Sequence, residues 1–186
     1  MSTPKPVRVT ILPDTDPAYR LLRTAVELAD SKGYRPGISD VRIAIVMRSG
    51  WKADRDGRLV LGKAHKMSDL EKECHVIADE GAEPPDAAIL VNAEAYPELT
   101  ERQKVALFFH EVLHFAVVHD DAGGPKQDER GRTVLRYVKH SIEEHVEVVE
   151  EFGLYKSDLV AFSEKCLAAK DNPLFGGEFP KVADVG

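Results

Sequence analysis

The sequence has few cysteines and no long apolar run, and both absences limit the class of protein. Its two cysteines, Cys74 and Cys166, lie far apart and form no CxxC pair. Neither a disulfide framework nor a thiolate zinc site is therefore expected. No stretch approaches the ~18 consecutive apolar residues of a membrane span, and residues 1–16 contain no apolar signal core. We therefore expect a cytoplasmic protein without a membrane partner.

The chain also has fewer basic than acidic residues. The chain has 25 Lys and Arg against 32 Asp and Glu, which gives a net charge of −7. This balance argues against a broad surface for nucleic acid, so we expect no nucleic-acid partner. The length of 186 residues suits one domain with a real core. We place a single domain, expected to be monomeric, at residues 1–170 and an irregular Gly- and Pro-rich tail at residues 171–186.

The first half of the chain contains one helix pattern followed by strand patterns. "DPAYRLLRTAVELADSKG" predicts a helix that Asp16 caps and Gly33 ends. "VRIAIVMR" (residues 41–48) alternates between apolar and other residues, which is typical of a half-buried strand. A turn then precedes a second strand at about residues 59–66, and we expect these two strands to form a hairpin. A short helix within "SDLEKECHVIADEGAEPPD" and a third strand, "AAILVNAEAY", follow.

The second half is predicted to be helical. Thr100 and Gln103 form a capping-box pattern, so a helix should begin at about Glu101, and we expect it to continue past His114. "TVLRYVKHSIEEHVEVVEEFG" predicts a long helix and "KSDLVAFSEKCLAAK" a last one. The order of elements predicts an α+β fold, in which a small mixed sheet packs against the helix that begins at Glu101 and against a second long helix.

The first of these helices contains His-Glu-x-x-His, the zinc-peptidase motif, within "ALFFHEVLHFAVVHDD". His110 and His114 are four residues apart, which places both imidazoles on one helix face, where they can share a metal ion. Glu111 lies about 100° round the helix and can act as general base for the metal-activated water. The pattern also arises by chance in core helices with two satisfied histidines. The capping box and the apolar flanks favour the metal site.

A catalytic zinc needs a third protein ligand, and the residues after the motif offer two candidates. Asp120 is ten residues after His110, a spacing that requires a bend in the chain. The bend would fall at Val117, and β-branched residues do not favour a sharp turn. His119 lies five residues beyond His114, on a different helix face if the helix continues.

The preferred candidate is His140, in "HSIEEH". Glu144 lies four residues later on the same predicted helix face and can orient a histidine of the first helix through its ring N–H. The reverse assignment, with Glu144 or Glu143 as the ligand, is the alternative. An oxyanion-stabilising donor would come from Tyr137, His145 or Tyr155, among which the sequence does not choose.

From about residue 41 to residue 155 the chain resembles the putative phage metallopeptidases, small zincin-like proteins of phages and prophages. The likeness includes "RIAIVMRSG" and "GRLVLGKAHKMSDL". The family typically shows Ala-Leu-x-x-His-Glu-Leu-x-His, matched at residues 106–114. It also shows His-x-x-Glu-Glu followed by Gly-Leu and an aromatic residue, matched at residues 140–155. The chain departs at Val112, where leucine is usual, and at His145, where an aromatic residue is usual.

The resemblance implies a compact zincin-like fold and a metal-dependent peptidase, and it supports His140 to Glu144 as part of the site. We therefore expect a narrow-specificity zinc peptidase (a hydrolase) in the cytoplasm of a bacterial host, with Zn²⁺ as cofactor and a protein or peptide as substrate. The alternative is a non-catalytic metal-binding protein that regulates or contacts a host system through a structural metal site.

Overall fold

The computed structural model describes residues 7–52, 59–78, 83–140, 154 and 157–170. Contacts divide the chain into a first unit, residues 1–139, and a second unit, residues 140–186. The first unit contains, in order, β1 (Val9–Ile11), α1 (Ala18–Ser31), η1 (Ile38–Asp40), β2 (Ile43–Arg48), β3 (Gly62–Lys66), α2 (Asp69–Ala78), β4 (Ala87–Asn92), η2 (Tyr96–Glu98), α3 (Glu101–Val112), β5 (Phe115–Val117) and β6 (Leu135–Tyr137). The described part of the second unit includes α5 (Ser157–Lys170).

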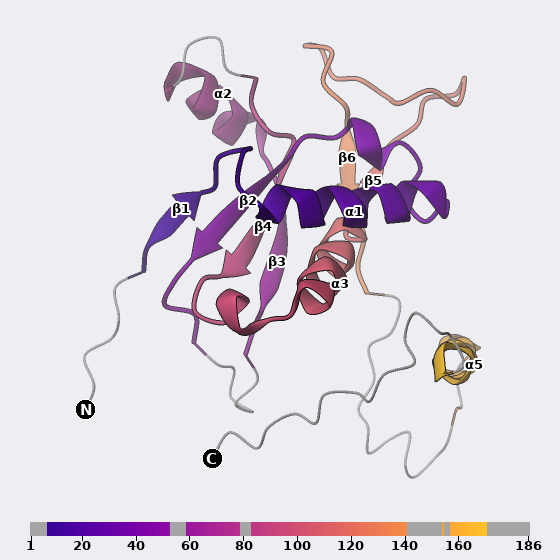
Figure 1. Ribbon diagram of the computed structural model, residues 1–186. Coiled ribbons are helices and arrows are strands. Elements are labelled where there is room, and N and C mark those ends of the chain that lie inside the picture. Colours follow the sequence, from indigo (N-terminus) through magenta and orange to yellow (C-terminus); the bar gives the residue numbers. More distant parts are fainter. Residues whose placement is uncertain (1–6, 53–58, 79–82, 141–153, 155–156, 171–186) are drawn as a thin grey trace. The chain divides into compact units, whose positions relative to one another are not determined.

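The first unit has a mixed sheet of four strands in the order β1-β2-β4-β3 (Figure 1). β2 and β4 are parallel, with Ile43 opposite Ala87 and Arg48 opposite Asn92, and the outer strands are antiparallel to their neighbours. The α+β fold with a small mixed sheet is thus confirmed. The predicted hairpin of β2 and β3 is wrong, because β4 lies between them. β4 is apolar almost throughout, which suits a central strand, whereas β3 carries Lys and His and lies at the edge.

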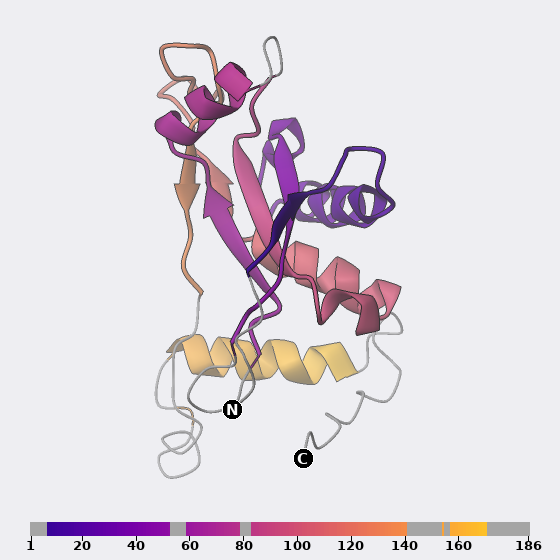
Figure 2. The same cartoon turned by 90° about the vertical axis from the view of Figure 1, so that its left-hand side faces the viewer.

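Helices α1 and α3 lie on the same face of this sheet and pack against each other (Figure 2). Side chains from both helices and from the two central strands form the core, among them the fully buried Ala25, Ile45, Ile89 and Phe108. Apolar burial of this kind contributes about 25 cal/mol per Å² of apolar surface removed from water. The core therefore fixes α3 against the sheet, and with it the residues of the His-Glu-x-x-His motif.

Helix α3 begins where the sequence predicts and ends earlier. The Thr100 side chain accepts a hydrogen bond from the Gln103 N–H at 3.3 Å, and the Gln103 side chain accepts one from the Thr100 N–H at 2.9 Å. The predicted capping box is therefore confirmed. The helix ends at Val112, so the expected continuation past His114 is wrong. The β-branched and aromatic residues that follow form the buried strand β5 instead.

Strand β6 replaces the first part of a predicted helix. Residues 135–137 pair antiparallel with β5, Phe115 lying opposite Tyr137, so the long helix predicted from residue 133 is wrong there. Local β-propensity and pairing with β5 outweigh the helical periodicity of this stretch. Residues 138–140 of that prediction are described and are not helical, and residues 141–153 lie outside the described residues.

The remaining predictions on elements have mixed outcomes. The helices expected near residues 18–31, 69–78 and 157–170 are confirmed as α1, α2 and α5, and strand β1 was not predicted. The single domain over residues 1–170 stays a prediction, and the expected tail at residues 171–186 lies outside the described residues. Among the described residues, none of the helices combines the length and apolar character needed to cross a membrane.

The segment between β5 and β6 is held by hydrogen bonds of its own and by ion pairs of Arg130 and Arg132 with Glu73 of α2. Backbone bonds continue the pairing beyond the strands, with the Val118 N–H donating to the Val134 carbonyl at 2.9 Å. Asp128 holds the turn, because its carboxylate accepts from the N–H groups of Arg130 and Arg132 at 2.9 Å each and from Arg132 Nε at 2.7 Å. The backbone hydrogen bond from Arg132 is the main cause that lowers the pKa of Asp128 to about 2.

We predict that Asp128 makes the stability of the protein depend on pH. Its pKa lies below the ordinary value of 3.8, so its contribution is present above that value and is lost as the pH falls through about 2. Urea unfolding should show the wild type more stable than Asp128→Asn at pH 6, with the difference shrinking towards pH 2. The exposed Asp121→Asn variant is the control. A difference that stays constant with pH would contradict this role of the carboxylate.

Candidate metal centre

The two histidines of the motif lie at the end of α3. His110 is in the last turn of the helix and is exposed, whereas His114 follows the helix and is buried. Leu113 keeps helical backbone angles, and the His114 N–H still donates to the Glu111 carbonyl at 3.2 Å. The turn therefore extends far enough to bring the two rings together, with their centroids 5.2 Å apart.

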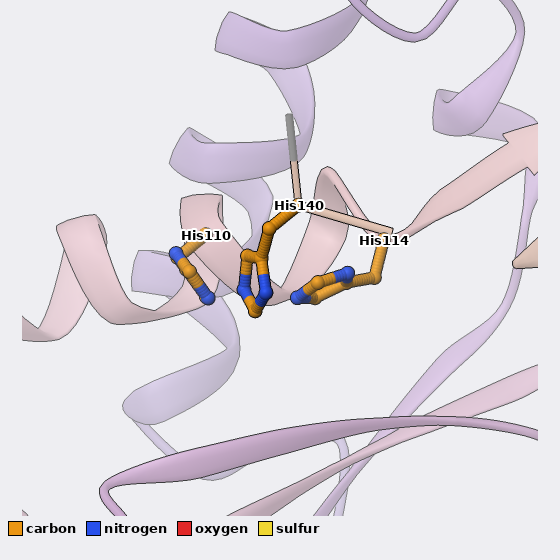
Figure 3. Close-up of side chains that lie close together, drawn as sticks. All are labelled: His110, His114 and His140. Carbon is orange, nitrogen blue, oxygen red and sulfur yellow. The ribbon is translucent and has the colours of Figure 1, made fainter. Parts of the chain in front are cut away.

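A third histidine joins this pair after β6. His110, His114 and His140 each offer a ring nitrogen, and the three nitrogens lie within 4.8 Å of one another (Figure 3). Imidazole nitrogens suit zinc and several other transition metals. The donor set therefore fits a divalent metal ion of this class, and among the described residues it is the group of three or more His, Cys, Asp or Glu side chains that could hold one.

Two hydrogen bonds between His114 and Val138 bring the chain back to α3. The Val138 N–H donates to the His114 carbonyl at 2.8 Å, and the Val138 carbonyl lies 2.7 Å from Nδ1 of the His114 ring. Because a carbonyl only accepts, Nδ1 carries the proton and Nε2 is left with its lone pair for a metal. His140 lies two residues beyond Val138 in the chain.

The predicted orienting group, Glu144, stays a prediction. The sequence favoured Glu144 as the partner of a motif histidine, and Glu144 and Glu143 lie outside the described residues. A described hydrogen-bond partner of the His114 ring is the main-chain carbonyl of Val138. Sequence reasoning missed it, because a carbonyl is present at every residue and leaves no signal of its own.

The end of α3 is held by Arg35, which the sequence did not single out. Arg35 Nε donates to the Leu113 carbonyl at 2.8 Å, and Nη2 donates to the same oxygen. A cation at a helix C-terminus also complements the helix dipole. Burial lowers the pKa of Arg35, and the nearby Arg136 adds to this. Arg35 therefore fixes the residue that immediately precedes His114.

Glu111 is buried between α3 and β3, with 4% of its surface exposed. Burial raises the pKa of its carboxyl, while a hydrogen bond with the Ala64 backbone and the nearby His114 act to lower it. The strand approaches closely at Gly62, where a Cβ atom would lie 2.9 Å from Glu111 Oε1. Glycine is thus required at this position if the carboxylate is to keep its place.

The other candidates from the sequence lie elsewhere. The Asp120 carboxylate accepts from the N–H groups of Ala122 and Gly124 at 3.0 and 2.9 Å, and it stabilises the loop in which it lies. His119 forms a backbone bridge with Pro125. Neither residue belongs to the three-histidine group.

The described oxyanion candidate is Tyr137, whose ring stacks on His114 with centroids 5.0 Å apart and planes 5° apart. The other two, His145 and Tyr155, lie outside the described residues. Tyr137 is half exposed, and one face of its ring covers His114. Both cysteines are free and exposed.

We predict that Arg35 positions His114 as well as stabilising the fold. Replacing Arg35 by Leu leaves the Leu113 carbonyl without its charged donor, which should lower the free energy of unfolding by about 2 kcal/mol. It should also weaken Zn²⁺ binding in a calorimetric titration, whereas Arg35→Lys should recover part of both. Arg23→Leu, at an exposed position of α1, is the control. A loss of stability with unchanged metal affinity would show a purely structural role.

Comparison with protein families gives one result. The family model described as putative phage metallopeptidase matches residues 18–166, which is most of the chain. No curated protein and no solved structure matches the chain. The matched range includes α3, both histidines of its motif and His140. The chain therefore belongs to the family of putative phage metallopeptidases.

Proposed function

We propose that the protein is a zinc-dependent peptidase, with His110, His114 and His140 as metal ligands and Glu111 as general base. The observation that carries the proposal is the convergence of these ring nitrogens beside a buried glutamate of the same helix. Membership of a metallopeptidase family supports a protein or peptide as the substrate. We further propose that the protein is a monomer of narrow specificity in the cytoplasm of a bacterial host. We also propose that it has no nucleic-acid partner, and its acidic net charge supports this last point.

The ligand set supports a catalytic site. Catalytic zinc is typically held by three protein ligands, which leaves a further position for water or substrate. Zinc in such a site lowers the pKa of a water molecule and polarises the carbonyl to be attacked. The alternative, a structural site, needs four protein ligands. The described group has three, and neither Asp120 nor any other described residue adds a fourth.

The surroundings of Glu111 support its proposed role as general base. It follows His110 directly, and its carboxylate is held in a buried place by α3 on one side and by β3 at Gly62 and Ala64 on the other. In the proposed reaction Glu111 accepts a proton from the attacking water and passes it to the nitrogen of the leaving amine. Val138 fixes His114, and Arg35 holds the end of α3. Together these contacts keep the distances between the proposed ligands and the proposed base constant.

We predict that Glu111→Gln keeps the metal and loses catalysis. Glutamine preserves the shape of the side chain but cannot accept the proton, so kcat/KM should fall by at least about 100-fold. Cleavage of a denatured protein mixture is followed by mass spectrometry, and bound zinc is measured by elemental analysis. Glu101→Gln, an exposed position on the same helix, is the matched control. Loss of metal together with activity would count against Glu111 as a base.

We predict that His140 is a ligand equal in importance to the two histidines of the motif. His140→Ala should weaken zinc binding by more than about 100-fold, because even residues that only orient a ligand contribute 10–100-fold. Competition with a chromogenic chelator measures the affinity. His65→Ala, which removes a histidine paired with Glu71 on the surface, should bind zinc as the wild type does. Unchanged affinity of the His140 variant would exclude His140 and point to residues 143–144.

A further inference from the structure

A pocket of about 420 Å³ opens between α3 and β3, directly beside the three-histidine group. Its walls are mainly apolar and include Leu61, Leu99 and Leu107. His110 and Glu111 form part of the same wall. The volume is in the range of small-ligand pockets, about 300–1,000 Å³. The proposed ligand and the proposed base thus face a cavity that belongs to the described part of the first unit.

The chemistry of the walls favours an apolar occupant. Gln103 contributes an amide to the pocket, but its oxygen already accepts from the Thr100 N–H and is bonded to the Thr100 hydroxyl, each at 2.9 Å. The charged side chain in the lining is Glu111, which is assigned to proton transfer. The lining is therefore mainly apolar, and burying an apolar group against it stabilises the complex.

The pocket is kept open by small residues. A Cβ atom at Gly62 would lie 2.9 Å from Leu107 Cδ1, so even one methyl group there would press on the wall. Ala106 lies on the exposed side of α3 and contributes only a methyl group to the lining. A larger residue at either position would occupy the space that the occupant needs.

We propose that this pocket binds a large aliphatic or aromatic side chain of the substrate, at a residue next to the bond that is cleaved. The inference rests on the proposed peptidase function and adds the determinant of its specificity. Because His110 and Glu111 belong both to the pocket wall and to the reacting group, a side chain held there belongs to a residue adjoining the scissile peptide. Consecutive Cα atoms are about 3.8 Å apart, so one residue spans the distance between the side chain in the pocket and the scissile peptide bond.

The first test is the cleavage pattern of a peptide library derived from a proteome. The zinc-loaded full chain should cut where Leu, Ile, Met, Phe or Tyr occupies one fixed position beside the bond. Ala106→Phe should fill the pocket. The preference for a peptide with Leu at that position over the same peptide with Ala, measured as the ratio of their kcat/KM values, should fall by about 10-fold or more. Arg102→Phe adds the same ring to α3 outside the pocket lining and should keep the preference. A preference for charged or small residues, or one that Ala106→Phe leaves intact, would overturn the inference.

A binding measurement separates this inference from the proposed function. N-acetyl-leucinamide is titrated into the zinc-loaded wild type and followed by NMR. It should shift the signals of Leu61 and Leu107 in the wild type and much less in Ala106→Phe. Binding without cleavage of any library peptide would refute the peptidase while supporting the pocket. Cleavage without an apolar preference would support the peptidase and refute the proposed pocket. Absence of N-acetyl-leucinamide binding would refute the proposed pocket whether or not peptides are cleaved.

Discussion

The pair of hydrogen bonds between His114 and Val138 is the constraint on which the centre depends. It joins two residues that are 24 positions apart and fixes both the main chain and the ring of His114. The same pair sets the point from which the chain continues to His140. Arg35 acts on the other side of His114 by holding the Leu113 carbonyl. The buried ring is thus fixed by main-chain groups and one guanidinium, none of which belongs to the motif.

The parts of the fold that could be predicted are those with a local signal. The capping box of Thr100 and Gln103 marked the start of α3, and alternation marked β2. The order of the strands could not be predicted from the sequence, because β2 and β3 both have patterns that suit a hairpin. The feature that favours β4 as the strand between them is its apolar character. The end of α3 was predicted too late, because the periodicity continues while the Leu113 carbonyl bonds to Arg35 and β5 pairs with β6.

In the candidate site, too, the residues with a local sequence signal could be predicted and the others could not. The motif and its helical context selected His110, His114 and Glu111. The spacing of His140 from Glu144, supported by the family resemblance, selected His140, which the structure brings to the other two histidines. Val138, Arg35 and Gly62 could not be selected in this way. They act through a main-chain carbonyl, through a bond between residues 78 positions apart, and through the absence of a side chain. Each of these roles can be recognised only once the fold brings residues that are distant in the sequence into contact.

The hydrogen-bonded segment between β5 and β6 has a consequence for how such chains can diverge. Its two ends are fixed by the pairing of Val118 with Val134 and of His114 with Val138. Its exposed tip around residues 121–131 is held by the carboxylates of Asp120 and Asp128 and by an ion pair of Arg130 with Glu73 of α2. The tip can therefore be lengthened or replaced without moving the histidines, since doubling a loop costs only about 0.6 kcal/mol in closure entropy. Related chains are free to acquire insertions there while the distance between their ligands stays constant.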